Sequence, residues 1–254
     1  MENIVIIGAS KGIGKSISLE LAKKNTHMIL VSRDIDNLEK TKLECEKKGG
    51  SAEVFKCDLL NEEDIKALCD HLKQIEIDIF IYNSGVVYGK DFSNMTEKEI
   101  NNILNINAMV PTRLTHLLME TFEKSKTHIV YIGSIASYFF GPGCTLYFAT
   151  KNYLKNFAYG VYEEFKRKGI KVLTVSPGFV ATDMVFNNTK KELGSIFICT
   201  PEFVAKEVRK AIEKKKRKIV VGKVNKLMVF WGRMIPSKLF GKLFYKVAKL
   251  YLKE

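Results

Sequence analysis

The sequence predicts an α/β fold, in which a doubly wound parallel sheet of seven strands carries helices on both faces. Short β-branched apolar runs alternate with helix-length segments, and parallel strands require such long crossovers. A chain of 254 residues is also long enough for one large core. The apolar runs lie at residues 4–7, 28–31, 52–55, 77–81, 128–132, 171–175 and 218–221.

The first strand leads into a turn that contains Gly8, Gly12 and Gly14, followed by a helix over residues 14–25. Glycines at such a turn allow the backbone to approach a pyrophosphate, and the helix N-terminus offers unpaired N–H groups. Glycine-rich turns are common, but the place after the first strand is the one that a dinucleotide site requires. The turn therefore predicts a dinucleotide-binding site.

The second strand ends in Ser32 and Arg33, before a helix over residues 35–48. An acid at this strand end binds the ribose hydroxyls of NAD and would repel a 2′-phosphate. Ser32 replaces the acid, and Arg33 and Lys11 add two cations near the expected ribose, with Arg33 suited to bind a phosphate through two N–H groups. We therefore predict NADP(H) as the cofactor. The alternative for both cations is a solvated surface position.

The strand at residues 128–132 is followed by Ser134 and, thirteen residues later, by Tyr147 and Lys151. Residues four apart on a helix share a face, so the phenol and the ammonium can point into one cleft. A cation beside a phenol lowers its pKa from the usual value of about 10. Such a pair can protonate a developing alkoxide while a nicotinamide delivers hydride. The same spacing also arises by chance on amphipathic helices.

Several motifs occur together in one order. They are Gly8-x-x-x-Gly12-x-Gly14, Asn83-Ser84-Gly85, Asn107, Ser134, Tyr147-x-x-x-Lys151 and Pro177-Gly178. In this order and spacing the sequence resembles the short-chain dehydrogenase/reductase family, from residue 4 to about residue 221. The resemblance implies a Rossmann-type fold. The departures are modest, since Ile7 replaces a usual Thr and Tyr82-Asn83-Ser84-Gly85 replaces a usual Asn-Asn-Ala-Gly.

The resemblance also implies a catalytic tetrad of Asn107, Ser134, Tyr147 and Lys151. Tyr147 would be the general acid in reduction and the base in oxidation, and Ser134 would hydrogen-bond the substrate oxygen. Lys151 would bind the nicotinamide ribose hydroxyls and lower the pKa of Tyr147. Asn107 would hold a water that connects Lys151 to a proton relay.

For the cofactor, the resemblance implies that Asp58 contacts the adenine and that residues 177–182 contact the nicotinamide carboxamide. Asn83 would lie where the family packs the sheet and the cofactor together. The expected cofactor-binding residues are Gly8, Ser10, Lys11, Gly12, Ile13, Gly14, Ser32, Arg33, Asp58, Leu59, Asn83, Gly85, Tyr147, Lys151, Pro177, Gly178, Val180 and Thr182.

The segment over residues 179–199 is the mobile lid over the substrate in the family. Its Phe, Val, Met and Ile residues favour an apolar cleft, as do Tyr138, Phe139 and Phe140 after the predicted catalytic serine. The alternative is that these side chains fill the core.

The charge is concentrated at the C-terminal end of the chain. The net charge is +13, and residues 214–254 hold thirteen basic residues and one acidic residue, so the first 213 residues are close to neutral. We therefore divide the chain into a catalytic domain over residues 1–221 and a basic amphipathic helical extension over residues 222–254.

The extension is amphipathic, with Pro236 separating a segment that contains Trp231 from a final helix. Lysines interleaved with bulky apolar residues are typical of a peripheral anchor on an anionic membrane. The alternative is a helix that packs on the body or on another subunit. We expect no nucleic-acid partner, because no nucleic-acid-binding fold or display of stacking aromatics is present. In the final helix the lysines are Lys238, Lys242, Lys246, Lys249 and Lys253, and the opposite face holds Leu239, Phe240, Leu243, Phe244, Val247, Leu250 and Tyr251.

The cysteines and the N-terminus indicate the compartment. The first apolar run is too short for a signal peptide, and no stretch reaches the roughly 18 apolar residues of a spanning helix. We expect a cytoplasmic protein, and peripheral contact with the inner face of a membrane is a further possibility. We expect no metal site. The five cysteines, Cys45, Cys57, Cys69, Cys144 and Cys199, are widely spaced and predict buried or half-buried thiols in a reducing compartment.

Together these features predict an NADPH-dependent oxidoreductase that reduces a ketone to a secondary alcohol. The expected substrate is hydrophobic, either a 3-oxoacyl group or a similar lipid-like or steroid-like ketone, and the expected assembly is a homo-oligomer, a dimer or a tetramer. The alternative is a non-catalytic NADPH-binding module that serves regulation or interaction. The complete tetrad argues against that alternative, because a sensor does not need all four groups.

Overall fold

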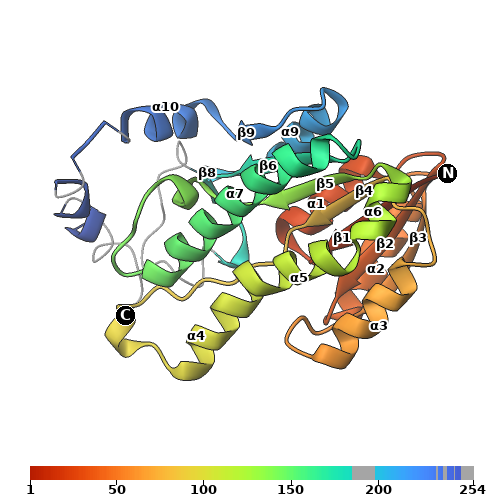
Figure 1. Cartoon of the computed structure of the whole chain (residues 1–254), viewed down its shortest axis with the longest axis horizontal. Coiled ribbons are helices and arrows are strands. Elements are labelled where there is room, and N and C mark those ends of the chain that lie inside the picture. The colour runs from red at the N-terminus through yellow and green to blue at the C-terminus, as the bar shows by residue number, and fades with distance from the viewer. Residues whose placement is uncertain (185–197, 233, 237–238, 243, 247–254) are drawn as a thin grey trace.

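The computed structural model contains the predicted sheet (Figure 1). It describes residues 1–184, 198–232, 234–236, 239–242 and 244–246. Seven parallel strands lie in the order β3-β2-β1-β4-β5-β6-β9, so that the order reverses between β1 and β4. The strands are β1 (Glu2–Ile7), β2 (Thr26–Ser32), β3 (Ser51–Lys56), β4 (Ile79–Tyr82), β5 (His128–Ile132), β6 (Lys171–Ser176) and β9 (Lys218–Val220).

Each predicted run falls in one of these strands, with small differences at the ends. Residues 77 and 78 precede β4, and residue 221 follows β9. A second sheet, which the sequence analysis did not predict, pairs β7 (Phe179–Val180) with β8 (Ile198–Cys199) in parallel.

Helices cover both faces of the large sheet, because alternate residues of each strand point to opposite sides. Val5 and Ile7 pack with the apolar residues of α3, α5, α6 and α7, while Ile4 and Ile6 pack with those of α1, α2 and α9. The helices are α1 (Gly12–Leu21), α2 (Ile35–Glu46), α3 (Glu62–Leu72), α4 (Glu97–Leu104), α5 (Val110–Leu117), α6 (Met119–Ser125), α7 (Thr145–Lys166), α9 (Pro201–Glu213) and α10 (Lys223–Gly232).

The predicted helix over residues 14–25 is shorter than expected at its C-terminal end. Helix α1 stops at Leu21, because its C-cap residue Ala22 has an extended backbone with a ψ of 119°. Helix α2 begins at the expected residue, where the Asp34 carboxylate accepts a hydrogen bond from the Asn37 N–H.

Three short elements join these helices and strands. Two are 3₁₀ helices, Phe92–Asn94 and Ile135–Tyr138, and the third is a π-helical segment, Asn105–Met109, between α4 and α5. In a π-helical turn each backbone hydrogen bond spans one residue more than in an α-helix, which changes the direction of the side chains in the turn.

All five cysteines are free thiols. Cys199 is half-buried, and the other four are buried, as predicted. In the part of the chain that the structure describes, no helix is long and apolar enough to cross a membrane.

The C-terminal extension continues beyond β9 as α10 and a second short helical segment around residues 239–246, on the side of the molecule away from the N-terminus (Figure 1). The second segment begins after Pro236, whose carbonyl accepts hydrogen bonds from Leu239 N and Phe240 N. The predicted positions 238, 243, 247, 249, 250, 251 and 253 lie outside the described residues, as does the part of the predicted lid over residues 185–197. The domain boundary at residue 221 stays a prediction.

Candidate active site

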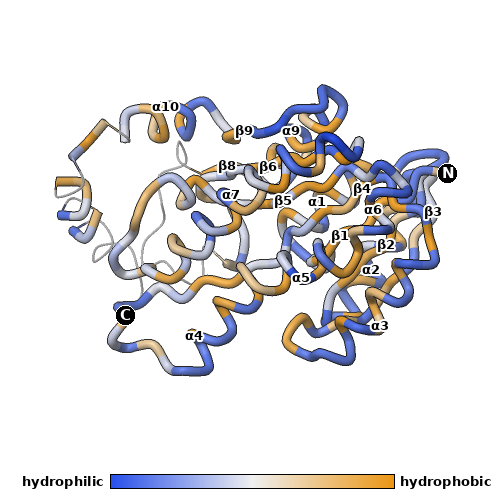
Figure 2. The backbone as a smooth tube through the Cα atoms, viewed as in Figure 1, coloured by the Kyte–Doolittle hydropathy of each residue, from blue (hydrophilic) through white to orange (hydrophobic). Residues whose placement is uncertain are grey.

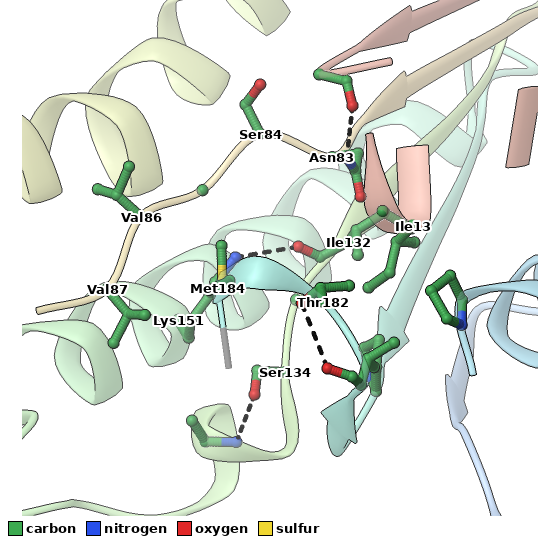
Figure 3. Close-up of a pocket in the computed structure, with 18 of the residues that line it drawn as sticks. Ile13, Asn83, Ser84, Val86, Val87, Ile132, Ser134, Lys151, Thr182 and Met184 are labelled. Atoms are coloured by element: carbon green, nitrogen blue, oxygen red, sulfur yellow. Dashed lines mark hydrogen bonds between the residues drawn. The ribbon is translucent and has the colours of Figure 1, made fainter. Parts of the chain in front are cut away.

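The turn after β1 is built around glycines that no other residue can replace without movement. Gly8 and Gly12 have φ angles of 88° and 56°. A Cβ atom on Gly14 would lie 1.9 Å from the Gly8 carbonyl oxygen. The Asn83 amide closes the turn from the neighbouring strand end, because its Nδ2 donates to the same oxygen at 2.8 Å (Figure 3).

The N-terminus of α1 is open for an anion. Its N-cap residue, Lys11, makes no side-chain cap, and the first turn contains no acidic residue. The unpaired N–H groups and the positive end of the helix dipole are therefore available to a phosphate. A dinucleotide pyrophosphate fits this place by geometry and by charge.

The predicted 2′-phosphate region lies beside that turn. The Ser32 hydroxyl donates to the Ser10 hydroxyl at 3.1 Å, and Arg33 is exposed along the same cavity. The Lys11 ammonium lies 3.0 Å from a carboxylate oxygen of Asp183, at the start of the predicted lid. The lysine therefore already has an anionic partner, which the sequence analysis did not foresee.

Ser134, Tyr147 and Lys151 converge at the ends of β5 and α7. The Lys151 ammonium lies 5.9 Å from the centre of the Tyr147 ring. It donates to the Ile132 carbonyl at 3.2 Å (Figure 3). The Ser134 hydroxyl oxygen accepts a hydrogen bond from Ala136 N, which leaves its proton for the Tyr147 oxygen or for a substrate oxygen. The three side chains are brought together as the spacing predicted.

The acid-base properties of the pair differ from the expectation in one respect. Burial raises the pKa of Tyr147 above its ordinary value of 10, and a hydrogen bond with Ser134 offsets part of this rise. Lys151 was expected to lower that pKa, but desolvation outweighs any such effect, and its ammonium is directed at the Ile132 carbonyl. The same burial lowers the pKa of Lys151 to about 8.

Asn107 lies in the π-helical segment and is fully buried. Its Nδ2 donates to the Val86 carbonyl at 2.9 Å and to the Thr150 hydroxyl at 3.1 Å, and its Oδ1 accepts from Val86 N at 2.8 Å. These bonds attach the segment of Gly85 and Val86 to α7. A Cβ atom on Gly85 would lie 3.2 Å from Lys151 Nζ, so the segment that Asn107 holds lies directly beside this lysine. No sequence pattern had indicated Thr150 as a partner of Asn107.

The segment after β6 closes the site from the other side. The Pro177 carbonyl accepts from Ile135 N at 2.8 Å, and Thr182 contacts the turn at Gly12. A Cβ atom on Gly178 would lie 2.4 Å from the amide of Asn225, a buried residue of α10 that donates to the Val221 carbonyl. No sequence pattern had singled out Asn225.

One cavity of about 1420 Å³ joins these parts. Every predicted site residue lines it except Gly14 and Asn107, which lie behind its wall. Among the described residues no group of three or more potential metal ligands occurs. The apolar part of the wall includes Val87, Ile135, Ala136, Phe139, Cys144, Phe148, Phe179, Met184, Met228, Trp231, Ile235, Phe240 and Phe244.

A profile of the short chain dehydrogenase family matches residues 2–193, three quarters of the chain. The chain is a member of the short-chain dehydrogenase/reductase family. It is therefore an oxidoreductase, as the motifs predicted.

Relatives with established names support the same family. A ketoacyl reductase of Nostoc sp. is 29% identical over 246 residues, 93% of this chain and 86% of the relative. The very-long-chain 3-oxoacyl-CoA reductase of Anas platyrhynchos is 35% identical over 187 residues, 71% of this chain and 60% of that longer protein. A short-chain dehydrogenase of Sphingobium yanoikuyae, solved in complex with NADPH, has the same fold with a TM-score of 0.81 at 23% identity, covering 92% of this chain and 94% of that one.

Proposed function

We propose that this protein uses NADPH to reduce a ketone to a secondary alcohol. The observation that carries the proposal is the convergence of Ser134, Tyr147 and Lys151 in the same cavity as the open glycine turn. The three side chains can supply hydrogen bonds and a proton where negative charge develops on a carbonyl oxygen. The glycine turn offers a binding place for a dinucleotide.

The residues at the ribose end favour NADPH over NADH. Ser32 presents a hydroxyl where NAD-binding proteins carry an acid, and Arg33 and Lys11 provide positive charge for the 2′-phosphate. Asp58 and Leu59 line the cavity at the adenine end. The NADPH complex of the Sphingobium relative is consistent with this choice.

NADPH, when bound, supplies the hydride. Ser134 then donates its hydroxyl proton in a hydrogen bond to the substrate oxygen, and Tyr147 transfers its phenolic proton to that oxygen as the alcohol forms. The raised pKa of Tyr147 keeps this proton in place at neutral pH until it is needed. Lys151, with a pKa of about 8, is an ammonium at neutral pH and stabilises the phenolate that remains.

The substrate proposal rests on the apolar wall of the cavity. Phe139, Cys144, Phe148, Phe240 and Phe244 lie beyond the catalytic side chains and offer no charge to a substrate. The names of the relatives, ketoacyl reductase and very-long-chain 3-oxoacyl-CoA reductase, are consistent with a 3-oxoacyl or similar lipid-like or steroid-like ketone.

The test is NADPH oxidation with a panel of soluble and lipid-like ketones, for the wild type and for Tyr147→Phe. We expect turnover to fall by about three orders of magnitude in the variant, because the proton donor is lost, while NADPH affinity stays within twofold. A variant that retains turnover would refute the role of Tyr147. Tight NADPH binding without turnover of any ketone in the wild type would instead favour the non-catalytic module.

We also propose that the chain forms a homo-oligomer, either a dimer or a tetramer. Met109, Leu117 and Tyr153 are large exposed side chains on the α5 and α7 side, and the Thr112 hydroxyl lies 3.0 Å from the Tyr153 hydroxyl. A second copy of the chain would remove this apolar surface from water. Light scattering after size exclusion measures the assembly directly, and a monomer at all concentrations would refute it.

A further inference from the structure

The C-terminal extension forms part of the wall of the cavity. The Phe240 ring stacks on Phe139 at 5.1 Å and meets Phe140 edge-on at 5.3 Å, and Phe244 contacts Phe148 at 5.1 Å. Of the two alternatives for the extension, packing on the body therefore holds for these described residues. It leaves the outer side of the extension open to a partner.

That outer side is apolar. Leu227, Phe230, Trp231 and Met234 recur at three- and four-residue spacing and are 59%, 61%, 60% and 69% exposed. We call these four residues the outer stripe. Helix α10 is held to the body by its other face, where Asn225 and Val229 are buried, and Figure 2 shows the hydrophobic stretches of this end of the molecule.

The stripe borders the mouth of the cavity. Trp231 lines the cavity and is nevertheless more than half exposed, so this residue of the stripe lies at the rim of the cavity. Ile235, which is also exposed, lines the same cavity, and exposed Leu239 adds to the apolar surface of the extension. An apolar molecule at this surface would therefore reach the cavity along apolar side chains.

Lysines flank the stripe. Lys223 and Lys226 are exposed one helical turn before Leu227 and Phe230, and Lys242 and Lys246 are exposed on the second segment. Between residues 214 and 253 the sequence contains no acidic residue to neutralise them. The combination therefore offers long cationic side chains around a group of bulky apolar ones.

We propose that the outer stripe and these lysines dock on an anionic lipid surface, with the mouth of the cavity facing the lipid. The apolar side chains enter the acyl boundary and the lysine ammonium groups reach the headgroups. A lipid surface fits better than an acidic protein, because half-exposed Leu, Phe, Trp and Met side chains need an apolar phase as well as negative charge. That the docked cavity receives a lipid-like ketone rests on the function proposed above.

Binding is measured without turnover, so that its outcome is independent of the enzymatic proposal. The full chain is mixed with vesicles of phosphatidylcholine alone, or of phosphatidylcholine with phosphatidylserine, and sedimented. Trp231 is the single Trp of the sequence, so its emission reports this site alone. We expect sedimentation and a blue shift with the anionic vesicles, weakened by high salt, and little of either with phosphatidylcholine alone.

Two sets of variants locate the binding surface. Leu227→Ser with Phe230→Ser is expected to weaken binding at least about tenfold. The matched control, Leu43→Ser with Phe92→Ser, removes similarly exposed side chains from other surfaces and is expected to bind as the wild type does. Removing four lysines of the site is expected to cost about tenfold or more, against little change for four exposed lysines elsewhere. The site set is Lys223→Gln, Lys226→Gln, Lys242→Gln and Lys246→Gln, and the control set is Lys24→Gln, Lys47→Gln, Lys48→Gln and Lys66→Gln.

Three outcomes would overturn the proposal. They are no sedimentation of the wild type with anionic vesicles, sedimentation without any change in Trp231 emission, and equal losses in the site and control variants. Circular dichroism and NADPH binding of every variant establish that a loss of vesicle binding is not a loss of folding. If the wild type docks but no ketone is reduced, the docking surface stands and the proposed reaction fails.

Discussion

Replacing Lys151 with Met is expected to stabilise the protein while it abolishes turnover. Below pH 8 this lysine carries its proton in both the folded and the unfolded chain, so the folded chain bears the cost of burying the charge. The pKa falls from 10.5 to about 8, which corresponds to about 3 kcal/mol because one pKa unit equals about 1.4 kcal/mol. Lys151 is only 4% exposed, so solvent screening reduces this cost little.

The substitution also has a cost. Methionine has a similar length but gives up the hydrogen bond to the Ile132 carbonyl, which contributes about 1 kcal/mol. The net expectation is that Lys151→Met raises the free energy of unfolding by about 2 kcal/mol at pH 7. Replacing a buried charged side chain with an apolar one of similar size often raises the free energy of unfolding.

The pH dependence distinguishes this reason from better packing. Between pH 8 and 10.5 the folded chain releases the Lys151 proton while the unfolded chain keeps it, so the stability of the wild type rises with pH. The variant lacks this rise. The higher stability of the variant is therefore fully present below pH 8 and disappears as the pH approaches 10.5.

Urea unfolding of the cofactor-free protein at pH 7 and at about pH 9.5 measures both effects. Lys166→Met, an exposed lysine on the same helix, is the control and is expected to change the free energy of unfolding by less than about 0.5 kcal/mol. A Lys151→Met variant less stable than the wild type at pH 7, or a difference that does not shrink with pH, would refute the reasoning.

Three further changes test other parts of the site. Gly14→Ala would place a methyl group 1.9 Å from a backbone oxygen of its own turn, and thermal unfolding should show a loss of at least about 2 kcal/mol together with loss of NADPH binding. Asp183→Asn should release Lys11 for the 2′-phosphate and tighten NADPH binding about two- to threefold with NADH unchanged; equal effects on both cofactors in a fluorescence titration would contradict this. Asn107→Ala removes three hydrogen bonds of a buried side chain and should lower the urea midpoint by the equivalent of about 2–4 kcal/mol, whereas a midpoint within error of the wild type would show that the bonds are dispensable.

Local patterns predicted the parts of the fold that depend on neighbours in sequence. The apolar runs located the seven strands, and the glycine turn and the spacing of Tyr147 and Lys151 located the site, because each depends on the geometry of a single turn or helix. The predicted helix ends were less accurate, since α1 ends at the extended backbone of Ala22, a change of conformation that the apolar pattern does not encode.

Contacts between distant segments could not be predicted in the same way. The ion pair of Lys11 with Asp183 joins positions 172 residues apart, and the bond of Asn107 to Thr150 depends on a π-helical turn with no periodic signature. The prediction that the pKa of Tyr147 is lowered was wrong for a similar reason. Desolvation depends on everything that surrounds the ring, whereas the sequence reveals only the lysine four residues away.

Phe240 and Phe244 of the extension contact aromatic side chains of the body. Two separate parts of the chain therefore form the wall of the cavity. The proposed catalytic groups lie just after β5 and on α7, while the C-terminal extension supplies part of the wall of the cavity. Under the proposed function, substitutions in the extension would therefore change which substrates fit the cavity and leave the proposed proton donor in place. For the same reason, exchanging this extension between related proteins offers a route to new substrate ranges on an unchanged catalytic body.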